Sequence, residues 1–404
     1  MRIFPDWIKE YMDYTRHSEA PDVFHFWTAV STLAGTLRRR VWIEQRYFQW
    51  TPNFYIFLVA PPGIVSKSTT TGIGMSLLAE VKGVNFGPDV VTWQALASSL
   101  ANSKELVQSP TTPDLWYPMS CLTIAAKELG TFFNPQDREM VDVLVSIWDS
   151  PLGVFQKMTK TQGDDVIENP WLNIIGCTTP SWIQANMPEY MIGGGFTSRS
   201  LFIYAEKKRQ FVAYPGDAIN SDEFYAQRNN LIQDLKHIAK SCVGEYRRTA
   251  EATKWGVEWY EQHWTHRPEH MSSERYGGYI ARKQTHIHKL AMILSAARRD
   301  ELVIEKDELI LSNELITALE RDMSKVFSAV GGSTNIELIK ELVVLTKVFK
   351  SVPQIEAWRR LMSQLPDHKA FQQLVNDCVA AGYVKLQQRD GQNYITYVGS
   401  PGDE

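Results

Sequence analysis

The chain has 404 residues, 44% of them hydrophobic and 22% charged, which is ordinary for a globular protein and long enough for two or three domains. Its 42 basic and 46 acidic residues give a net charge of −4, so no chain-wide basic field indicates nucleic-acid binding, and any DNA contact must come from local patches. No run of about 18 apolar residues is present, so we expect a cytoplasmic protein with no membrane partner.

The four cysteines lie far apart in the sequence, at Cys121, Cys177, Cys242 and Cys378. Their spacing matches neither a paired metal site nor a dense disulfide framework. We therefore expect four buried free thiols in a reducing compartment.

Residues 1–45 are predicted to form an N-terminal helical segment. Apolar side chains recur at three- and four-residue spacing within 4–18 and again within 22–40. This spacing is typical of amphipathic helices, which we expect to pack ahead of the first strand.

Residues 46–218 are predicted to form the core domain. The apolar run 53–60 is followed by a glycine turn and by a helical pattern over 67–81. Further apolar strands are expected at 120–126, 171–179 and 198–207. Strands that alternate with helices in this way predict a three-layer α/β fold with a mostly parallel central sheet.

The segment APPGIVSKSTT resembles a phosphate-binding P-loop with altered spacing. The usual pattern, G-x-x-x-x-G-K-[ST], has glycines one and six residues before its lysine. Here those positions hold Ser66 and Pro61, and Gly63 lies four residues before Lys67. The alternative is a serine–threonine helix cap with an incidental lysine.

Each residue of this loop has an expected role if the loop binds ATP and Mg²⁺. Gly63 would take the positive-φ turn, and Lys67 would supply the charge that meets the β- and γ-phosphates. Ser68 would offer its hydroxyl to Mg²⁺, with Thr69 as a substitute one position later. Ser66 stands where glycine is usual, so its Cβ would crowd the phosphate.

A nucleotide-hydrolysing site also needs an acidic residue on a neighbouring strand. In TIAAKELGTFF an apolar strand ends at Lys127 and Glu128, where Asp-Glu is expected. Glu128 would orient the attacking water, and Asp149 is the alternative Mg²⁺ ligand because Lys127 cannot ligate a cation. The competing interpretation is a surface Lys–Glu pair at a strand end.

The segment NIIGCTTP ends another strand with Thr178 and Thr179. Their hydroxyls suit a sensor of the γ-phosphate or of the attacking water. The alternative is ordinary turn chemistry before Pro180.

The segment GGGFTSRSLFIYAEKKR combines the glycines at 193–195 with Arg199 just before an apolar strand. An arginine in this position suits a finger delivered to the phosphate of a neighbouring subunit. Lys207, Lys208 and Arg209, at the far end of the strand, compete for that role. The alternative is a flexible loop followed by a solvated basic cluster.

Residues 219–330 are predicted to be a helical lid or bundle, and 330–335 a short linker. Three helix patterns and a two-stranded hairpin within 335–404 predict a winged-helix domain. One of its helices has a polar face suited to reading bases, formed by Lys369, Gln372, Gln373 and Asn376. Because 335–404 has eight basic and eight acidic residues, protein contact is the alternative.

Taken in order, these motifs, with VVTWQALASSL and YIARKQTHIHKLAMIL, resemble the phage and prophage P-loop ATPases of the replicative helicase type. That family is often described only as a domain of unknown function beside a primase. The resemblance covers roughly residues 20–330. It implies a RecA-like or AAA-like core, a homo-oligomeric ring, a primase or other replication partner, and ATP-driven translocation on DNA, expected to be single-stranded.

The resemblance also implies roles for individual residues. Lys67 and Ser68 match the phosphate and Mg²⁺ positions, Glu128 the catalytic acid, Thr179 the sensor and Arg199 the finger. The chain departs from the family in the longer spacing before Lys67, in Ser66 and in Lys127. These departures favour one alternative, a weakly hydrolysing or non-hydrolysing initiator or loader. Another alternative is a transcriptional regulator that uses the winged helix.

Overall fold

The computed structural model describes residues 1–89, 92–108, 114–159, 163–192, 194–266, 271, 276–327, 334–362, 364–365, 367–389 and 391–399. The chain forms two compact units, Met1–Ser328 and Ala329–Glu404. The predicted regions 1–45 and 46–218, and nearly all of 219–330, belong to the first unit. The predicted linker at 330–335 lies largely outside the described residues, as does the first of the three glycines at 193–195.

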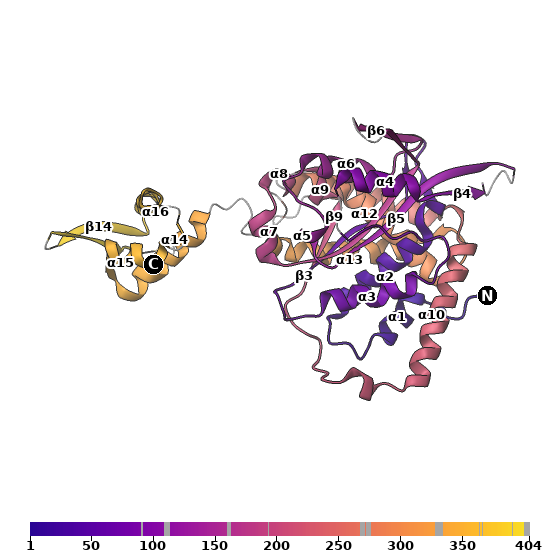
Figure 1. The fold of residues 1–404 in the computed structure, drawn as a ribbon, viewed down its shortest axis with the longest axis horizontal. Coiled ribbons are helices and arrows are strands. Elements are labelled where there is room, and N and C mark those ends of the chain that lie inside the picture. Colours follow the sequence, from indigo (N-terminus) through magenta and orange to yellow (C-terminus); the bar gives the residue numbers. More distant parts are fainter. Residues whose placement is uncertain are drawn as a thin grey trace. The chain divides into compact units, whose positions relative to one another are not determined.

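A five-stranded sheet forms the centre of the first unit (Figure 1). Across the sheet, the strands are β4 (Lys104–Gln108), β5 (Trp116–Ala126), β8 (Pro170–Thr178), β3 (Tyr55–Val59) and β9 (Ser200–Tyr204). The last four run parallel, and β4 pairs antiparallel with β5. The predicted α/β class with a mostly parallel central sheet is confirmed, whereas β4 was not predicted.

Helices cover both faces of this sheet, as Figure 1 shows for α4 (Trp93–Asn102) and α6 (Arg138–Trp148) on one side and α2 (Asp22–Leu37) and α3 (Lys67–Leu78) on the other. The Tyr55 hydroxyl donates to the carbonyl of Leu144 in α6. The amide of Asn173 donates instead to Ser31 in α2. Since Tyr55 pairs with Ile174, the adjacent Asn173 points to the opposite face, so the unit has three layers.

Helix α2 is buried on nearly all sides, although the sequence suggested an amphipathic helix. It lies between the sheet and the outer helices α1 (Trp7–Tyr14) and α10 (Ser221–Ser241). The hydroxyls of Thr28, Thr32 and Thr36 each donate to the carbonyl four residues earlier. These bonds satisfy the polar atoms that burial would otherwise leave unpaired.

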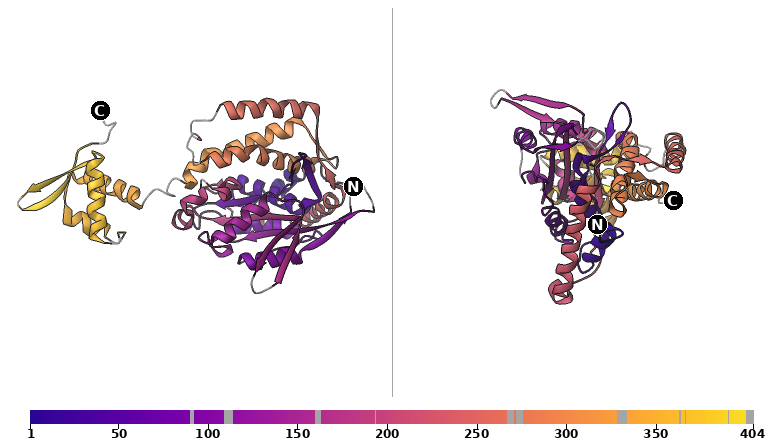
Figure 2. Two further views of the ribbon diagram at one scale, coloured as in Figure 1. Left: turned by 90° about the horizontal axis from the view of Figure 1, so that it is seen from above. Right: turned by 90° about the vertical axis from the view of Figure 1, so that its right-hand side faces the viewer.

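The remaining elements surround this core. The helices are α5 (Leu129–Phe132), α7 (Pro180–Asn186), α8 (Glu189–Ile192), α9 (Gly195–Ser198), α11 (Ala250–Thr265), α12 (Gly277–Arg298) and α13 (Lys306–Phe327). The short strands are β1 (Val41–Glu44), β2 (Gln49–Trp50), β6 (Val154–Thr159), β7 (Gly163–Glu168), β10 (Gly244–Glu245), β11 (Arg247–Arg248) and β12 (Val303–Ile304). Helices α12 and α13 lie side by side, and α13 packs against β9 (Figure 2). In the part of the chain that the structure describes, no helix is both long and apolar enough to cross a membrane.

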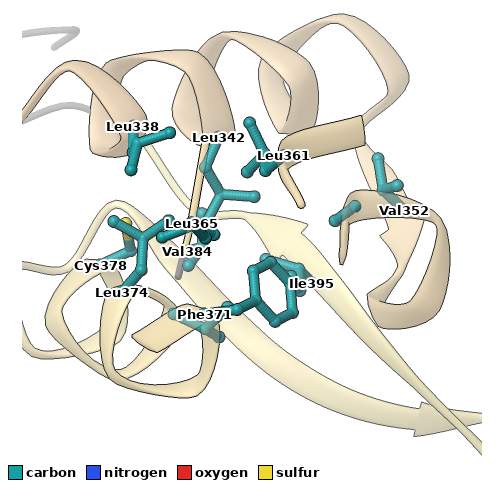
Figure 3. Close-up of a cluster of buried hydrophobic side chains, with 12 residues drawn as sticks. Leu338, Leu342, Val352, Leu361, Leu365, Phe371, Leu374, Cys378, Val384 and Ile395 are labelled. Carbon is teal, nitrogen blue, oxygen red and sulfur yellow. The ribbon is translucent and has the colours of Figure 1, made fainter. Parts of the chain in front are cut away.

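The second unit contains α14 (Thr334–Phe349), β13 (Ser351–Pro353), α15 (Gln354–Leu361), α16 (His368–Ala380), β14 (Val384–Arg389) and β15 (Gln392–Tyr397). Its strands form an antiparallel sheet in the order β13-β15-β14. Leu342, Phe371, Leu374 and Ile395 belong to its own hydrophobic core (Figure 3). The three helices and the hairpin were predicted, whereas β13 was not.

All four cysteines are free and buried, as the sequence predicted. Burial raises the pKa of Cys121, Cys177 and Cys242 to about 12. These thiols are therefore protonated at neutral pH and act as small apolar groups.

Candidate functional site

A pocket of about 330 Å³ lies at the carboxyl ends of β3, β5 and β8. Open α/β sheets bind their ligands at this edge, and the volume is within the range of small-molecule sites. Three segments line the pocket: the loop that leads into α3, the residues after β5 and the residues around the end of β8. They include the predicted site residues Gly63, Ser66, Lys67, Ser68, Glu128 and Thr179.

The strand register explains why these segments meet. Val59 at the end of β3 pairs with Thr178 in β8, and Ala126 at the end of β5 pairs with Gly176. The three strands therefore end nearly level with one another. Neighbouring strands are about 4.8 Å apart, so β3 and β5, with β8 between them, end about 10 Å apart. The residues that follow β3 and β5 can therefore contact the same phosphate group beyond the end of β8.

The loop between β3 and α3 has the backbone that the sequence suggested. Gly63 has φ +72°, and a Cβ there would meet no atom within 4 Å. Ser66 precedes α3, but its side chain makes no capping hydrogen bond. The alternative of a serine cap therefore lacks its defining contact at Ser66. The amide of Lys67 donates to the carbonyl of Val65 at 2.9 Å and that of Thr70 to the carbonyl of Ser66, so the amides of Ser68 and Thr69 are the ones that another acceptor can use. Thr69 is exposed on α3 and does not line the pocket.

Lys67, the first residue of α3, reaches back across the loop. Its Nζ donates to the carbonyl oxygen of Ala60 at 3.0 Å, and its side chain is half-buried. Burial lowers the pKa of Lys67, whereas Cys177 and Glu128 oppose that shift. A single carbonyl partner can be exchanged for a phosphate oxygen, so this lysine is available to an anionic ligand.

Glu128 occupies the first position before α5, and its side chain makes no capping hydrogen bond there. Both Glu128 and Lys127 are exposed and line the pocket. Burial lowers the pKa of Lys67, and the negative charge of Glu128 is close enough to oppose that shift. The pocket therefore brings an acid from β5 and a lysine from α3 to the same space.

Gly130 and Trp182 are pocket residues that the sequence did not reveal. Both line the pocket, and a Cβ at Gly130 would collide with the indole of Trp182. Glycine at this position lets α5 approach α7. In the sequence, Gly130 two residues after Glu128 was the signal that could have indicated a close contact at this point. Its contact partner, Trp182, is more than 50 residues away, so spacing alone could not identify it.

The two threonines at the end of β8 have different surroundings. Thr179 caps α7: its hydroxyl accepts a bond from the amide of Trp182 at 3.1 Å and lies 3.0 Å from Ser181 Oγ. Thr178 is 6% exposed and its Oγ1 has no hydrogen-bond partner, although it lines the pocket. Thr179 therefore caps the turn into α7, which was the alternative to a sensor role. Thr178 is the threonine whose hydroxyl has no hydrogen-bond partner in the structure.

Arg199 and Asp149 lie at the opposite edge of the sheet. Arg199 precedes β9, whose first residue pairs with Tyr55 at the start of β3. Its Nη2 donates to Asp149 Oδ2 at 2.5 Å and its Nη1 to the Gly195 carbonyl at 3.1 Å. Arg199 is 6% exposed. The structure therefore brings neither Arg199 nor Asp149 to the pocket, and it gives the predicted trans-acting arginine a partner in its own chain.

A buried cluster around Trp148 accounts for this arrangement. The guanidinium of Arg199 lies 5.7 Å from the Trp148 ring centroid, and the ammonium of Lys289 lies 3.6 Å from it. Lys289 Nζ also donates to Asn53 Oδ1 at 2.7 Å. Burial lowers the pKa of Lys289 well below its usual value. These contacts tie α12 to the amino-terminal edge of the sheet.

The basic cluster after β9 is mostly engaged within the chain. Lys208 pairs with Glu19 at 2.6 Å, and Arg209 pairs with Asp22. Of the three basic residues at 207–209, Lys207 is the exposed one. The cluster thus connects the end of β9 to the residues that lead into α2.

The predicted polar face of the second unit is present on α16. Phe371 and Leu374 point into the core, and the other side of the helix carries the four predicted side chains. Three of these are exposed, Lys369, Gln373 and Asn376, whereas Gln372 is half-buried.

No protein-family model matches this chain, and no curated protein sequence matches it. Within the described residues, no group of three or more His, Cys, Asp or Glu side chains is placed to hold a metal ion.

Proposed function

We propose that this protein binds ATP in the pocket at the carboxyl ends of β3, β5 and β8 and hydrolyses it to move along DNA. The observation that carries the proposal is the convergence of Lys67, Glu128 and Thr178 from three adjacent strand ends. In this proposal the loop 60–66 acts as a P-loop with altered spacing.

The binding step follows from the unpaired groups of the pocket. The amides of Ser68 and Thr69 and the positive end of the α3 dipole favour a phosphate group. Lys67 exchanges the Ala60 carbonyl for phosphate oxygens, and Ser68 and Thr178 donate their hydroxyls. Gly63 lets the loop turn around the phosphate chain, while Ser66 narrows the space beside it.

The hydrolytic step uses Glu128. Its carboxylate accepts a proton from water as the water oxygen attacks the γ-phosphorus. The bond from the γ-phosphorus to the bridging oxygen breaks, and ADP leaves with that oxygen. Lys67 stabilises the charge that develops on the phosphate oxygens.

The DNA-related part of the proposal is supported by the sequence motifs and by the second unit. The motifs resemble ring-forming ATPases of the replicative helicase type, for which single-stranded DNA and a primase are the expected partners. The three helices and three strands of the second unit suit a winged helix. In that case α16 presents Lys369, Gln373 and Asn376 to DNA.

A second function is favoured by Lys127. A lysine beside the catalytic acid is unfavourable for the metal ion on which phosphoryl transfer usually depends. The second candidate is therefore a replication initiator or loader that binds ATP for assembly and hydrolyses it slowly or not at all. An ATPase assay with and without single-stranded DNA separates the two candidates, because only the translocase should show turnover that DNA stimulates.

Isothermal titration with a non-hydrolysable ATP analogue tests the binding site itself. Lys67→Ala should lose at least about tenfold in affinity, because the loop loses its one charged side chain. Lys82→Ala is the matched control, since Lys82 is exposed shortly after α3 and does not line the pocket. Equal affinity of both variants would exclude this pocket as the phosphate site.

A further inference from the structure

Lys127 places a second positive charge in the pocket. The charged side chains that line it are Lys67, Lys127 and Glu128. Lys127 directly follows β5 and is exposed at the position where an aspartate was expected. Among the described residues that line the pocket there are therefore two cations and one carboxylate.

This donor set does not fit a Mg²⁺ ion. Mg²⁺ needs near-octahedral oxygen coordination and is usually held by one or two carboxylates together with phosphate oxygens. Ser68 and Glu128 offer oxygen atoms, but the ammonium of Lys127, one residue before Glu128, repels a divalent cation. Asp149, the alternative ligand, is paired with Arg199 at the other edge of the sheet.

We infer that the pocket binds the triphosphate of a nucleotide without Mg²⁺, and that Lys127 supplies the positive charge in place of the metal ion. The inference rests on the proposed nucleotide-binding function. Lys67 approaches from the β3 side and Lys127 from the β5 side, with the end of β8 between them. Because both lysines line the pocket, their two positive charges would neutralise a phosphate chain bound in it.

Thr178 independently indicates a ligand between the two lysines. Its side chain is buried, and its Oγ1 has no hydrogen-bond partner in the structure. A buried hydroxyl without a partner is unfavourable, and a phosphate oxygen would satisfy it. Thr178 lines the pocket at the end of the central strand, and rotation of its side chain would bring the buried Oγ1 to a phosphate chain held by the two lysines.

The test is isothermal titration of the full-length protein with a non-hydrolysable ATP analogue, in excess EDTA and in excess Mg²⁺. We expect the wild type to bind at least as tightly in EDTA as in Mg²⁺. Lys127→Asp, which introduces the expected carboxylate, should bind at least about tenfold more weakly in EDTA and recover in Mg²⁺. Lys82→Asp makes the same charge change away from the pocket and should match the wild type.

The outcomes separate this inference from the proposed function. Wild-type binding that requires Mg²⁺ would overturn the inference and leave the nucleotide site intact. Absence of binding in both conditions would overturn both. A folded Lys127→Asp protein with wild-type metal dependence would also overturn the inference. Circular dichroism checks folding, and the wild-type comparison stays decisive if that variant does not fold.

Discussion

The guanidinium of Arg199 and the carboxylate of Asp149 form an ion pair at 2.5 Å, at the edge of the sheet opposite the pocket. The Arg199 side chain is 8% exposed and that of Asp149 is 52% exposed. The arginine is thus the member of the pair that depends on its partner, because it has little access to water. The pair holds the start of β9 against the end of α6.

Loss of Asp149 should therefore destabilise the fold through the arginine that remains. We expect Asp149→Asn to lower the free energy of unfolding by about 2 kcal/mol, somewhat less than for a fully buried pair because Asp149 is hydrated. Urea denaturation measures the change, and Arg199→Ala with Asp149→Asn completes a double-mutant cycle. Additive effects of the two substitutions would show that the contact contributes nothing.

The same burial predicts that Arg199 acts within its own subunit. Folded Arg199→Ala protein should therefore hydrolyse ATP at about the wild-type rate, and mixing it with inactive Lys67→Ala protein should only dilute that activity, because a buried arginine does not reach a neighbouring site. The activity of the mixture is measured over a range of ratios. A maximum of ATPase activity at intermediate ratios would show that Arg199 completes the site of a neighbouring subunit, as the sequence suggested.

Glu128→Gln should retain ATP binding and lose turnover by a factor of about 10² or more, because the amide keeps the shape but cannot accept a proton from water. Steady-state ATPase rates and titration of the same preparation measure both properties. Glu258→Gln, at an exposed position on α11, serves as the control. Normal turnover in Glu128→Gln would mean that the base lies elsewhere in the chain.

Thr178→Val should have opposite effects on stability and on binding. Removal of a buried hydroxyl without a partner should leave the empty protein equally stable or more stable by about 1 kcal/mol. The same change should weaken binding of an ATP analogue about tenfold, because the ligand loses a donor. Thr178→Ser should keep the affinity. Unchanged affinity in the valine variant would place the phosphate away from β8.

The second unit should fold alone, since its core is its own. A fragment of residues 334–404 should unfold cooperatively in urea, and Phe371→Ala should lower its free energy of unfolding by about 3–5 kcal/mol.

In the folded fragment, Lys369→Ala should weaken DNA binding measured by fluorescence anisotropy. Equal binding by the wild-type and Lys369→Ala fragments would leave α16 free for a protein partner instead.

Stability should fall in mild acid because three histidines are buried. Burial lowers the pKa of His286 to about 3 and that of His288 to about 4, and burial together with Arg209 lowers the pKa of His25 to about 4. The unfolded chain takes up these protons below pH ~6.5 and the folded chain does not, so stability is lost as pH falls from ~6.5 to ~4.

Each histidine should contribute about 3 kcal/mol to that loss. Urea denaturation at several pH values measures it, and His25→Gln should show a shallower decline than the wild type. A decline of equal slope in both proteins would mean that His25 titrates normally in the folded state.

The sequence predicted the local parts of the pocket well. An apolar run, a glycine turn and a lysine at the start of a helix are adjacent in the chain, so residues 53–78 indicated their own strand, loop and helix. The position of Glu128 just after β5 could be predicted for the same reason. Strand β4 was missed because it is a short edge strand whose side chains are mostly not buried, which leaves little hydrophobic pattern to detect.

Long-range relationships were not accessible in the same way. The pairing of Arg199 with Asp149 depends on the order of strands in the sheet, which spacing does not reveal. The different surroundings of Thr178 and Thr179 depend on where α7 begins, two residues after the last residue of β8. One feature of the sequence could have shown that Arg199 lies away from the pocket. Arg199 comes just before a strand expected to be parallel, which places it at the amino-terminal edge of the sheet, whereas the pocket lies at the carboxyl edge.

The close approach of Gly130 to Trp182 means that the residues acceptable at these two positions depend on each other during evolution. A side chain at 130 would collide with the indole of Trp182 in its present position, so we expect it to be accepted when that indole shifts or is replaced by a smaller side chain. Related chains should therefore pair glycine at 130 with a large residue at 182, or a larger residue at 130 with a small one at 182. A chain with bulk at both positions would have to hold α5 and α7 apart and would carry a wider pocket.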